Sequence, residues 1–95
     1  MIEMELYHLR YVIALAERQN FSKAADELFI TQPTLSQQIK KLEETLGIQI
    51  FFRTTKTVTL TRDGKEFVEK ARTVMKYYEE LEDWTRQRGK HDDRE

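Results

Sequence analysis

The sequence of 95 residues contains no cysteine, one proline and three glycines. Without cysteine it can form neither disulfides nor thiolate metal sites, which suits the reducing cytoplasm where we expect the protein to work. No apolar run approaches the about 20 residues that a membrane span needs, and the N-terminus lacks the basic start and apolar run of a signal peptide. These absences favour a small soluble domain without membrane contact.

Residues that would carry catalysis or hold a cofactor are also sparse. His8 and His91 lie far apart in the sequence and are not combined with carboxylates at metal-ligand spacing. Gly47, Gly64 and Gly89 are too scattered to form a glycine-rich phosphate-binding loop. We therefore predict that the chain is not an enzyme and that it binds no metal or cofactor.

The charge of the chain is unevenly distributed. The formal net charge is −1 at pH 7, which argues mildly against a nucleic-acid partner. Because attraction to phosphates is screened within about 10 Å, the local distribution matters more than the sum. Acidic residues gather after position 78, whereas the middle of the chain is basic. The basic residues of this middle part are Lys40, Lys41, Arg53, Lys56, Arg62 and Lys65.

The apolar periodicity predicts three short helices in the first half of the chain. The first runs from about Tyr7 to Arg18. The second follows Ser22, a good N-cap, and turns Ala24, Ala25 and Leu28 inward. The third is capped by Thr31, has Pro33 in its first turn, where a missing N–H costs little, and stops at Gly47. Its apolar line consists of Leu35, Ile39, Leu42 and Leu46.

The second half predicts a small hairpin and one long helix. The β-rich runs Ile48–Arg53 and Val58–Leu60 are separated by a threonine-rich turn. Thr61 is placed to cap a final helix without a breaker as far as Arg88. The expected fold is mainly α: a winged helix-turn-helix of three helices and a two-stranded wing, followed by a long dimerisation helix. We assign residues 1–61 to the winged domain, 62–88 to the linker helix and 89–95 to a disordered tail.

The outward side of the third helix suggests what this fold does. Its N-terminal half carries amides and hydroxyls, whereas ordinary solvated faces favour glutamate and lysine. This third helix would be the second helix of a helix-turn-helix motif. The N-terminal half of that helix reaches base edges in the DNA major groove. The alternative is a solvated surface without a ligand. The candidate base-reading residues are Gln32, Pro33, Thr34, Ser36 and Gln37.

Cations near this face are candidates for phosphate or minor-groove contacts. Lys40 and Lys41 lie one turn further along the third helix, and Arg53 and Lys56 lie at the wing. The alternative roles are solubility for the lysines and protection of an edge strand by charge at the wing.

An apolar stripe on the final helix predicts a homodimer. Its residues alternate steps of four and three, as in a coiled-coil seam, and the helix is too long for a three-helix core to cover. The alternative is that the stripe packs on its own domain. The predicted interface residues are Phe67, Ala71, Val74, Tyr78 and Leu81.

These features together resemble the N-terminal domain of LysR-type transcriptional regulators, from Glu5 to about Leu81. The matching segments include Leu9–Val12, Ala14–Glu17, Ala24–Ala25, Thr31–Ile39, Leu42–Glu43, Leu46–Gly47, Ile50–Arg53 and Leu60–Thr61. The resemblance implies a bacterial regulator that binds an interrupted palindrome in double-stranded DNA at promoters, as a dimer or a dimer of dimers. It also implies that Gln32, Pro33 and Thr34, with Ser36 and Gln37, face the major groove.

Two features separate the chain from a typical member. Many members have arginine at the position of Gln37, so this chain is expected to prefer adenine to guanine there. Members also continue into a C-terminal effector-binding domain that is absent from this chain, which we expect to be a DNA-binding fragment or a truncated regulator. The rival interpretation is a winged helix that binds another protein and no DNA.

Overall fold

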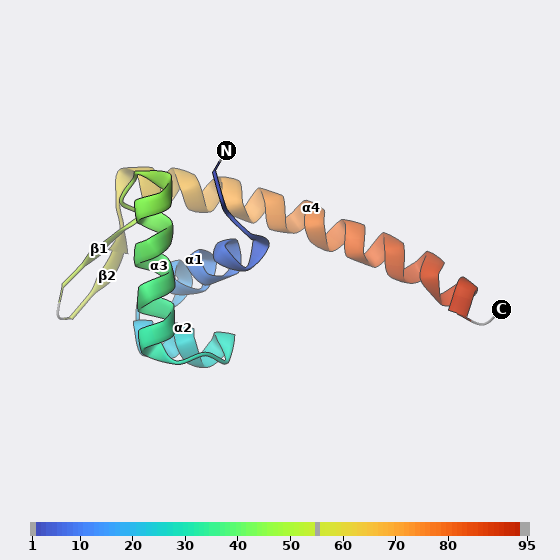
Figure 1. Ribbon diagram of the computed structural model, residues 1–95, viewed down its shortest axis with the longest axis horizontal. Coiled ribbons are helices and arrows are strands. Elements are labelled where there is room, and N and C mark those ends of the chain that lie inside the picture. The colour runs from blue at the N-terminus through green and yellow to red at the C-terminus, as the bar shows by residue number, and fades with distance from the viewer. Residues whose placement is uncertain (1, 55, 94–95) are drawn as a thin grey trace.

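The computed structural model describes residues 2–54 and 56–93, with side chains as far as residue 89. Figure 1 shows a body of three helices, a hairpin that extends from one side of it and a long helix that extends from the other. The elements are α1 (Leu6–Arg18), α2 (Phe21–Leu28), α3 (Gln32–Leu46), β1 (Phe51–Arg53), β2 (Val58–Leu60) and α4 (Arg62–Asp93). The predicted winged helix-turn-helix with a long final helix is confirmed.

The start of α2 differs from the prediction. The N-cap is Asn20, whose side-chain oxygen accepts a hydrogen bond of 2.8 Å from the backbone N–H of Lys23. Ser22 therefore lies in the first turn, where it contacts α3. The helix ends at Phe29, which adopts a left-handed conformation (φ 59°) and is 95% exposed. Both Asn20 and Ser22 are good caps, so the local sequence did not distinguish them.

The ends of α3 agree with the prediction. Thr31 is the N-cap, and its hydroxyl oxygen accepts from the backbone N–H of Thr34 at 3.2 Å. Gly47 ends the helix with φ 73°, a left-handed conformation that glycine adopts without steric cost. The buried face of α3 consists of Leu35, Ile39 and Leu42, each at most 2% exposed. This face fixes which side of α3 meets solvent.

The core has two parts. The larger one joins α1, α2 and α3 to the wing and to the start of α4. Its buried residues are Val12, Ala14, Leu15, Ala24, Ala25, Leu35, Ile39, Leu42, Ile50, Phe51, Val58 and Val68. The smaller one lies between α1 and α4 and is formed by Leu9, Ala71 and Met75. The second cluster attaches the first half of α4 to the body.

The first strand of the wing is shorter than predicted. β1 and β2 are antiparallel, with Phe51 paired to Leu60 and Arg53 paired to Val58. Residues 48–50, which we expected to begin the strand, are not in it. The reason lies at Ile50, whose N–H donates to Glu43 and whose carbonyl accepts from the N–H of Thr61 at 2.9 Å. The N–H of Ile50 thus bonds to α3 and not across the hairpin, whereas its carbonyl is opposite Thr61 in the register that pairs β1 with β2.

The long helix α4 begins where predicted and ends later. The hydroxyl of Thr61 accepts from the backbone N–H of Gly64 at 2.9 Å, so Thr61 caps the helix. The helix continues to Asp93, and residues 89–93 are helical where we expected a disordered tail; residues 94 and 95 lie outside the described residues. Beyond the α1 contact, α4 extends away from the body (Figure 1). Among the described residues, no helix is both long and apolar enough to span a bilayer.

The two helical glycines of α4 give a matched test of this packing. A β-carbon at Gly64 would overlap the carbonyl oxygen of Ile50, whereas one at Gly89 would meet no atom within 4 Å. Gly64→Ala should therefore lower the free energy of unfolding by about 1–3 kcal/mol through overpacking. Gly89→Ala should leave it unchanged or raise it by up to about 1 kcal/mol, because alanine favours helix. Urea denaturation measures both, and equal effects would contradict the packing of α4 on Ile50.

Candidate nucleic-acid interface

The predicted base-reading residues lie outside the buried face of α3, with Pro33 and Gln37 roughly opposite it. Gln32, Pro33, Thr34 and Gln37 are exposed, and Ser36 is partly exposed. They are held there because Leu35 and Ile39, in the same turns, are buried in the core. Together they form a polar surface on the N-terminal half of α3, which we call the recognition face.

Two side chains of the recognition face are oriented by hydrogen bonds within the protein. The hydroxyl of Ser22 donates to the amide oxygen Oε1 of Gln32 at 2.8 Å. The hydroxyl of Thr31 donates to Oγ1 of Thr34, also at 2.8 Å. The capping role of Thr31 was predicted, but the contact of Ser22 was not, because it joins positions on two different helices.

The wing is tied to α3 by the carboxylate of Glu43. Its Oε2 accepts from the backbone N–H groups of Ile50 (2.8 Å) and Phe51 (3.1 Å). Its Oε1 accepts from Nη2 of Arg53 at 2.9 Å. The Glu43 side chain is 10% exposed, so these bonds are largely shielded from water. Sequence analysis named Glu43 only within a segment that carries the family resemblance and missed this role.

The four predicted cations have different surroundings. Lys40, Lys41 and Lys56 are exposed. Arg53 is bound to Glu43, and its guanidinium carbon lies 5.7 Å from the ring centre of Phe21. With 32% of its side chain exposed, Arg53 serves the attachment of the wing and keeps only part of its surface for a ligand.

An open groove of about 490 Å³ separates α3 from the wing. Ser36 and Lys40 line it from α3, and Arg53 lines it from β1. The groove therefore connects one candidate base-reading residue with two candidate phosphate-binding residues. Glu43 and Glu44 also line the groove, so charges of both signs border the recognition face on the wing side.

His8 lies at the start of α1, against the other edge of α3. Its Nδ1 accepts a hydrogen bond of 2.9 Å from the backbone N–H of Glu5, which requires that this nitrogen carry no proton. Burial is the main cause that lowers the pKa of His8, and Lys41 lowers it further; Glu5 and a hydrogen bond with Gln38 oppose the shift. His8 thus acts as a neutral capping residue. Among the described residues, no three His, Asp or Glu side chains are grouped to hold a metal ion.

The predicted dimer stripe on α4 is largely used by the chain itself. Ala71 is 3% exposed and belongs to the cluster with Leu9, against which Phe67 and Tyr78 also pack. Ala71 is thus covered by α1 within the same chain, whereas Phe67 and Tyr78 are only partly buried. Val74 and Leu81 remain open, at 47% and 58% exposure. Trp84, which lies near the end of the predicted stripe, and Tyr77, which we did not predict, are also exposed, at 53% and 62%.

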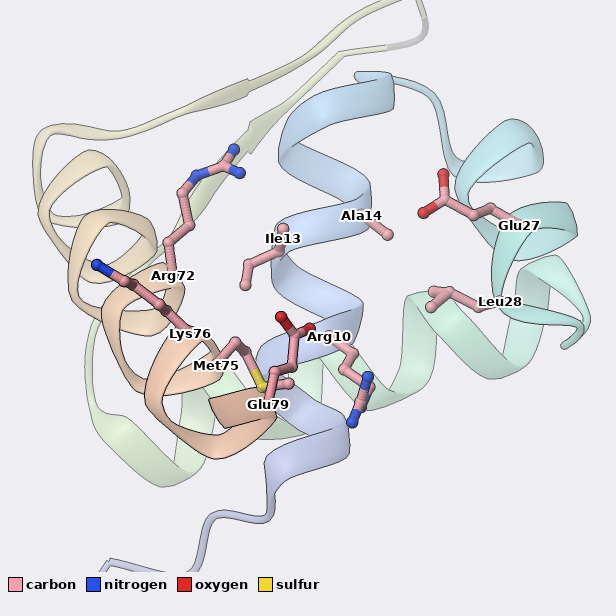
Figure 2. A pocket seen from close by; sticks show the side chains of 9 residues that line it. All are labelled: Arg10, Ile13, Ala14, Glu27, Leu28, Arg72, Met75, Lys76 and Glu79. Carbon is pink, nitrogen blue, oxygen red and sulfur yellow. The ribbon is translucent and has the colours of Figure 1, made fainter. Parts of the chain in front are cut away.

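A second open groove, of about 440 Å³, lies between α1, α2 and α4, and Figure 2 shows the side chains that line it. Ile13 and Ala14 come from α1, and Leu28 and Met75 add apolar surface from α2 and α4. Charged side chains of both signs surround this apolar lining: Arg10, Glu27, Arg72, Lys76 and Glu79. None of the lining residues comes from α3 or the wing, so this groove is separate from the recognition face.

Comparison with known proteins identifies the family. The model of the family described as "Bacterial regulatory helix-turn-helix protein, lysR family" matches residues 6–65. The chain belongs to this family. The matched residues contain α1 to β2 and the start of α4, and therefore the whole recognition face.

Individual LysR-family proteins support the same assignment. The chain is 46% identical over 78 residues to an uncharacterized HTH-type transcriptional regulator, YcgK, of Bacillus subtilis; these residues are 82% of this chain and 24% of that protein. It is 45% identical over 83 residues to BenM of Acinetobacter baylyi, which is 87% of this chain and 27% of BenM. The chain thus spans about a quarter of the length of these curated relatives.

Solved structures of LysR-family domains have the same fold. The DNA-binding domain of BenM in complex with catB site 1 DNA gives a TM-score of 0.87 at 42% identity, covering 93% of this chain and 95% of that one. The DNA-binding domain of CbnR in complex with DNA gives a TM-score of 0.84 at 34% identity, covering 90% and 99%. Because so much of this chain is covered, both comparisons include most of α4.

The Glu43 contacts predict a specific loss of stability. Glu43→Ala should lower the free energy of unfolding by about 1–3 kcal/mol, because the N–H groups of the fully buried Ile50 and Phe51 would lose their acceptor. Glu44→Ala is the matched control. This neighbouring side chain is exposed, and its removal should change stability by less than about 0.5 kcal/mol. Urea denaturation compares the two, and similar effects would contradict the role of Glu43.

Proposed function

We propose that this chain binds specific double-stranded DNA as the DNA-binding part of a bacterial LysR-type transcriptional regulator in the cytoplasm. The observation that carries the proposal is the recognition face: amides and hydroxyls exposed on α3, backed by the buried Leu35, Ile39 and Leu42. A helix exposed in this way enters the major groove with its N-terminal residues at base edges. DNA complexes of BenM and CbnR, solved with the same fold, support the proposal.

The residues of the face have separate tasks in this proposal. Gln37 reads an adenine, because its amide can donate to N7 and accept from N6 of that base. Pro33, Thr34 and Ser36 contact neighbouring base edges. Lys40 and Lys41, one turn later, bind phosphates, and Lys56 binds the backbone or the minor groove at the tip of the wing. Arg53 orients the wing through Glu43 and turns the rest of its guanidinium toward a phosphate.

The functional unit we propose is a homodimer joined through α4. The exposed apolar residues Val74, Tyr77, Leu81 and Trp84 follow one another at steps of three, four and three, the spacing of a coiled-coil seam. Two chains joined in this way present two copies of α3 to two half-sites of a pseudo-palindrome.

DNA binding is tested by selecting bound duplexes from random sequence and measuring their affinity against salt concentration. The logarithm of the binding constant should fall with the logarithm of salt, with a slope of about −0.9 for each phosphate neutralised. Gln37→Ala should relax the preference at one or two base pairs, whereas Lys41→Ala should weaken all duplexes alike. A flat salt response, or a uniform loss for both variants, would contradict the proposal and favour a protein-binding role.

The dimer is tested by sedimentation velocity. The wild-type chain should sediment as a dimer, and the double variant Tyr77→Glu, Leu81→Glu should sediment as a monomer with unchanged helical circular dichroism, because charges in the seam cannot be desolvated. Lys76→Glu, at an exposed position beside the seam, is the control and should remain dimeric. A monomeric wild type, or a dimeric double variant, would disprove the proposed interface.

A further inference from the structure

The N-terminus of α3 presents its polar groups in a defined orientation. Ser22, in the first turn of α2, donates its hydroxyl proton to Oε1 of Gln32, the first residue of α3. Both side chains are exposed, so the bond lies at the surface where the recognition face begins. The bond turns the carbonyl oxygen of the Gln32 amide toward α2. The amide nitrogen, on the other side of the same carbon, supplies the donors that Gln32 can offer outward.

Thr34 is oriented in the same sense by a second contact. Oγ1 of Thr31 accepts from the Thr34 N–H and donates to Oγ1 of Thr34. Because the Thr34 oxygen already accepts one hydrogen bond within the protein, its own proton is left to be donated. Gln32 and Thr34 therefore each use one acceptor position internally, while their donors remain free to face outward. This end of the recognition face is complementary to hydrogen-bond acceptors.

The four base pairs differ in how well they match such a surface. Guanine presents two acceptors in the major groove, N7 and O6, whereas adenine presents the acceptor N7 beside the donor group N6–H₂. A glutamine that reads adenine must place its carbonyl oxygen and an N–H side by side against the base. For Gln32, that orientation competes with the bond from Ser22. This distinguishes Gln32 from Gln37, to which adenine was assigned above.

We propose that Ser22 is a positioning residue for base recognition: by holding the carbonyl oxygen of Gln32, it makes Gln32 prefer guanine over adenine at one base pair of each half-site. The inference rests on the proposed DNA binding and adds to it a determinant outside α3. It follows that a residue with no base contact of its own controls which base is preferred.

The experiment uses the duplex selected with the wild-type chain. Each base pair of the half-site is replaced by the other three, and dissociation constants are measured by fluorescence anisotropy. Gln32→Ala first identifies the base pair read by Gln32, as the position where the preference is lost. At that position the wild type should bind guanine at least about fivefold more tightly than adenine, the lower end of what one paired contact supplies.

The decisive comparison is between two variants of Ser22. Ser22→Ala removes the donor and should shift the guanine-to-adenine ratio at that base pair by at least about fivefold toward adenine. Ser22→Thr keeps a hydroxyl at the same position and should retain the wild-type ratio. Circular dichroism melting confirms that both variants fold as the wild type does, as expected for an exposed position.

The possible results separate this inference from the proposed function. A wild type that prefers adenine at the Gln32 position, or an unchanged ratio in Ser22→Ala, would overturn the role of Ser22 while DNA binding stands. Equal weakening of all duplexes by Ser22→Ala would also overturn it, since the hydroxyl would then contact a phosphate. Absence of any selected duplex for the wild-type chain would instead refute DNA binding itself.

Discussion

The attachment of the wing to the recognition helix depends on one carboxylate. Glu43 accepts three hydrogen bonds from the first side of the wing, two of them from the backbone of Ile50 and Phe51. Ile50 in turn accepts from the N–H of Thr61, which caps α4. A continuous set of short contacts therefore joins α3, the wing and α4. Because the backbone groups involved are buried, breaking any member leaves a polar atom without a partner, so the three elements keep one relative position.

This rigidity has a consequence for recognition. Ordering flexible side chains at an interface costs free energy, and a site whose groups are already oriented avoids part of that cost. On the recognition face, orientation is supplied from below by the buried Leu35 and Ile39 and from the side by Ser22 and Thr31. Of these supporting residues, Ser22 alone comes from a helix other than α3. If α3 reads bases as proposed, a substitution of Ser22 would change specificity without any contact to a base.

How much the sequence revealed depended on whether the deciding interactions were local. The bounds of α3 were predictable because Thr31 and Gly47 act within one turn of the residues they cap. The contacts of Glu43 with Arg53 and of Ser22 with Gln32 each span ten residues, and no periodicity encodes them. The strand was expected to begin at Ile48 because β propensity marked the whole run, but the N–H of Ile50 bonds to Glu43 of α3 instead of the opposite strand.

The apolar pattern of α4 shows the limit of such inference most clearly. Its repeat indicated a surface to be covered, and in the structure only part of that surface is covered. One strip, with Ala71 and Met75, is covered by α1, whereas Tyr77 and Leu81 stay exposed on the helix that leaves the body. The first strip fixes α4 to the same body that carries α3. A second copy of the chain bound to the other strip would therefore hold its own α3 in a fixed position relative to the first. The separation of half-sites in DNA would then be set by packing on α4, not by a flexible connection.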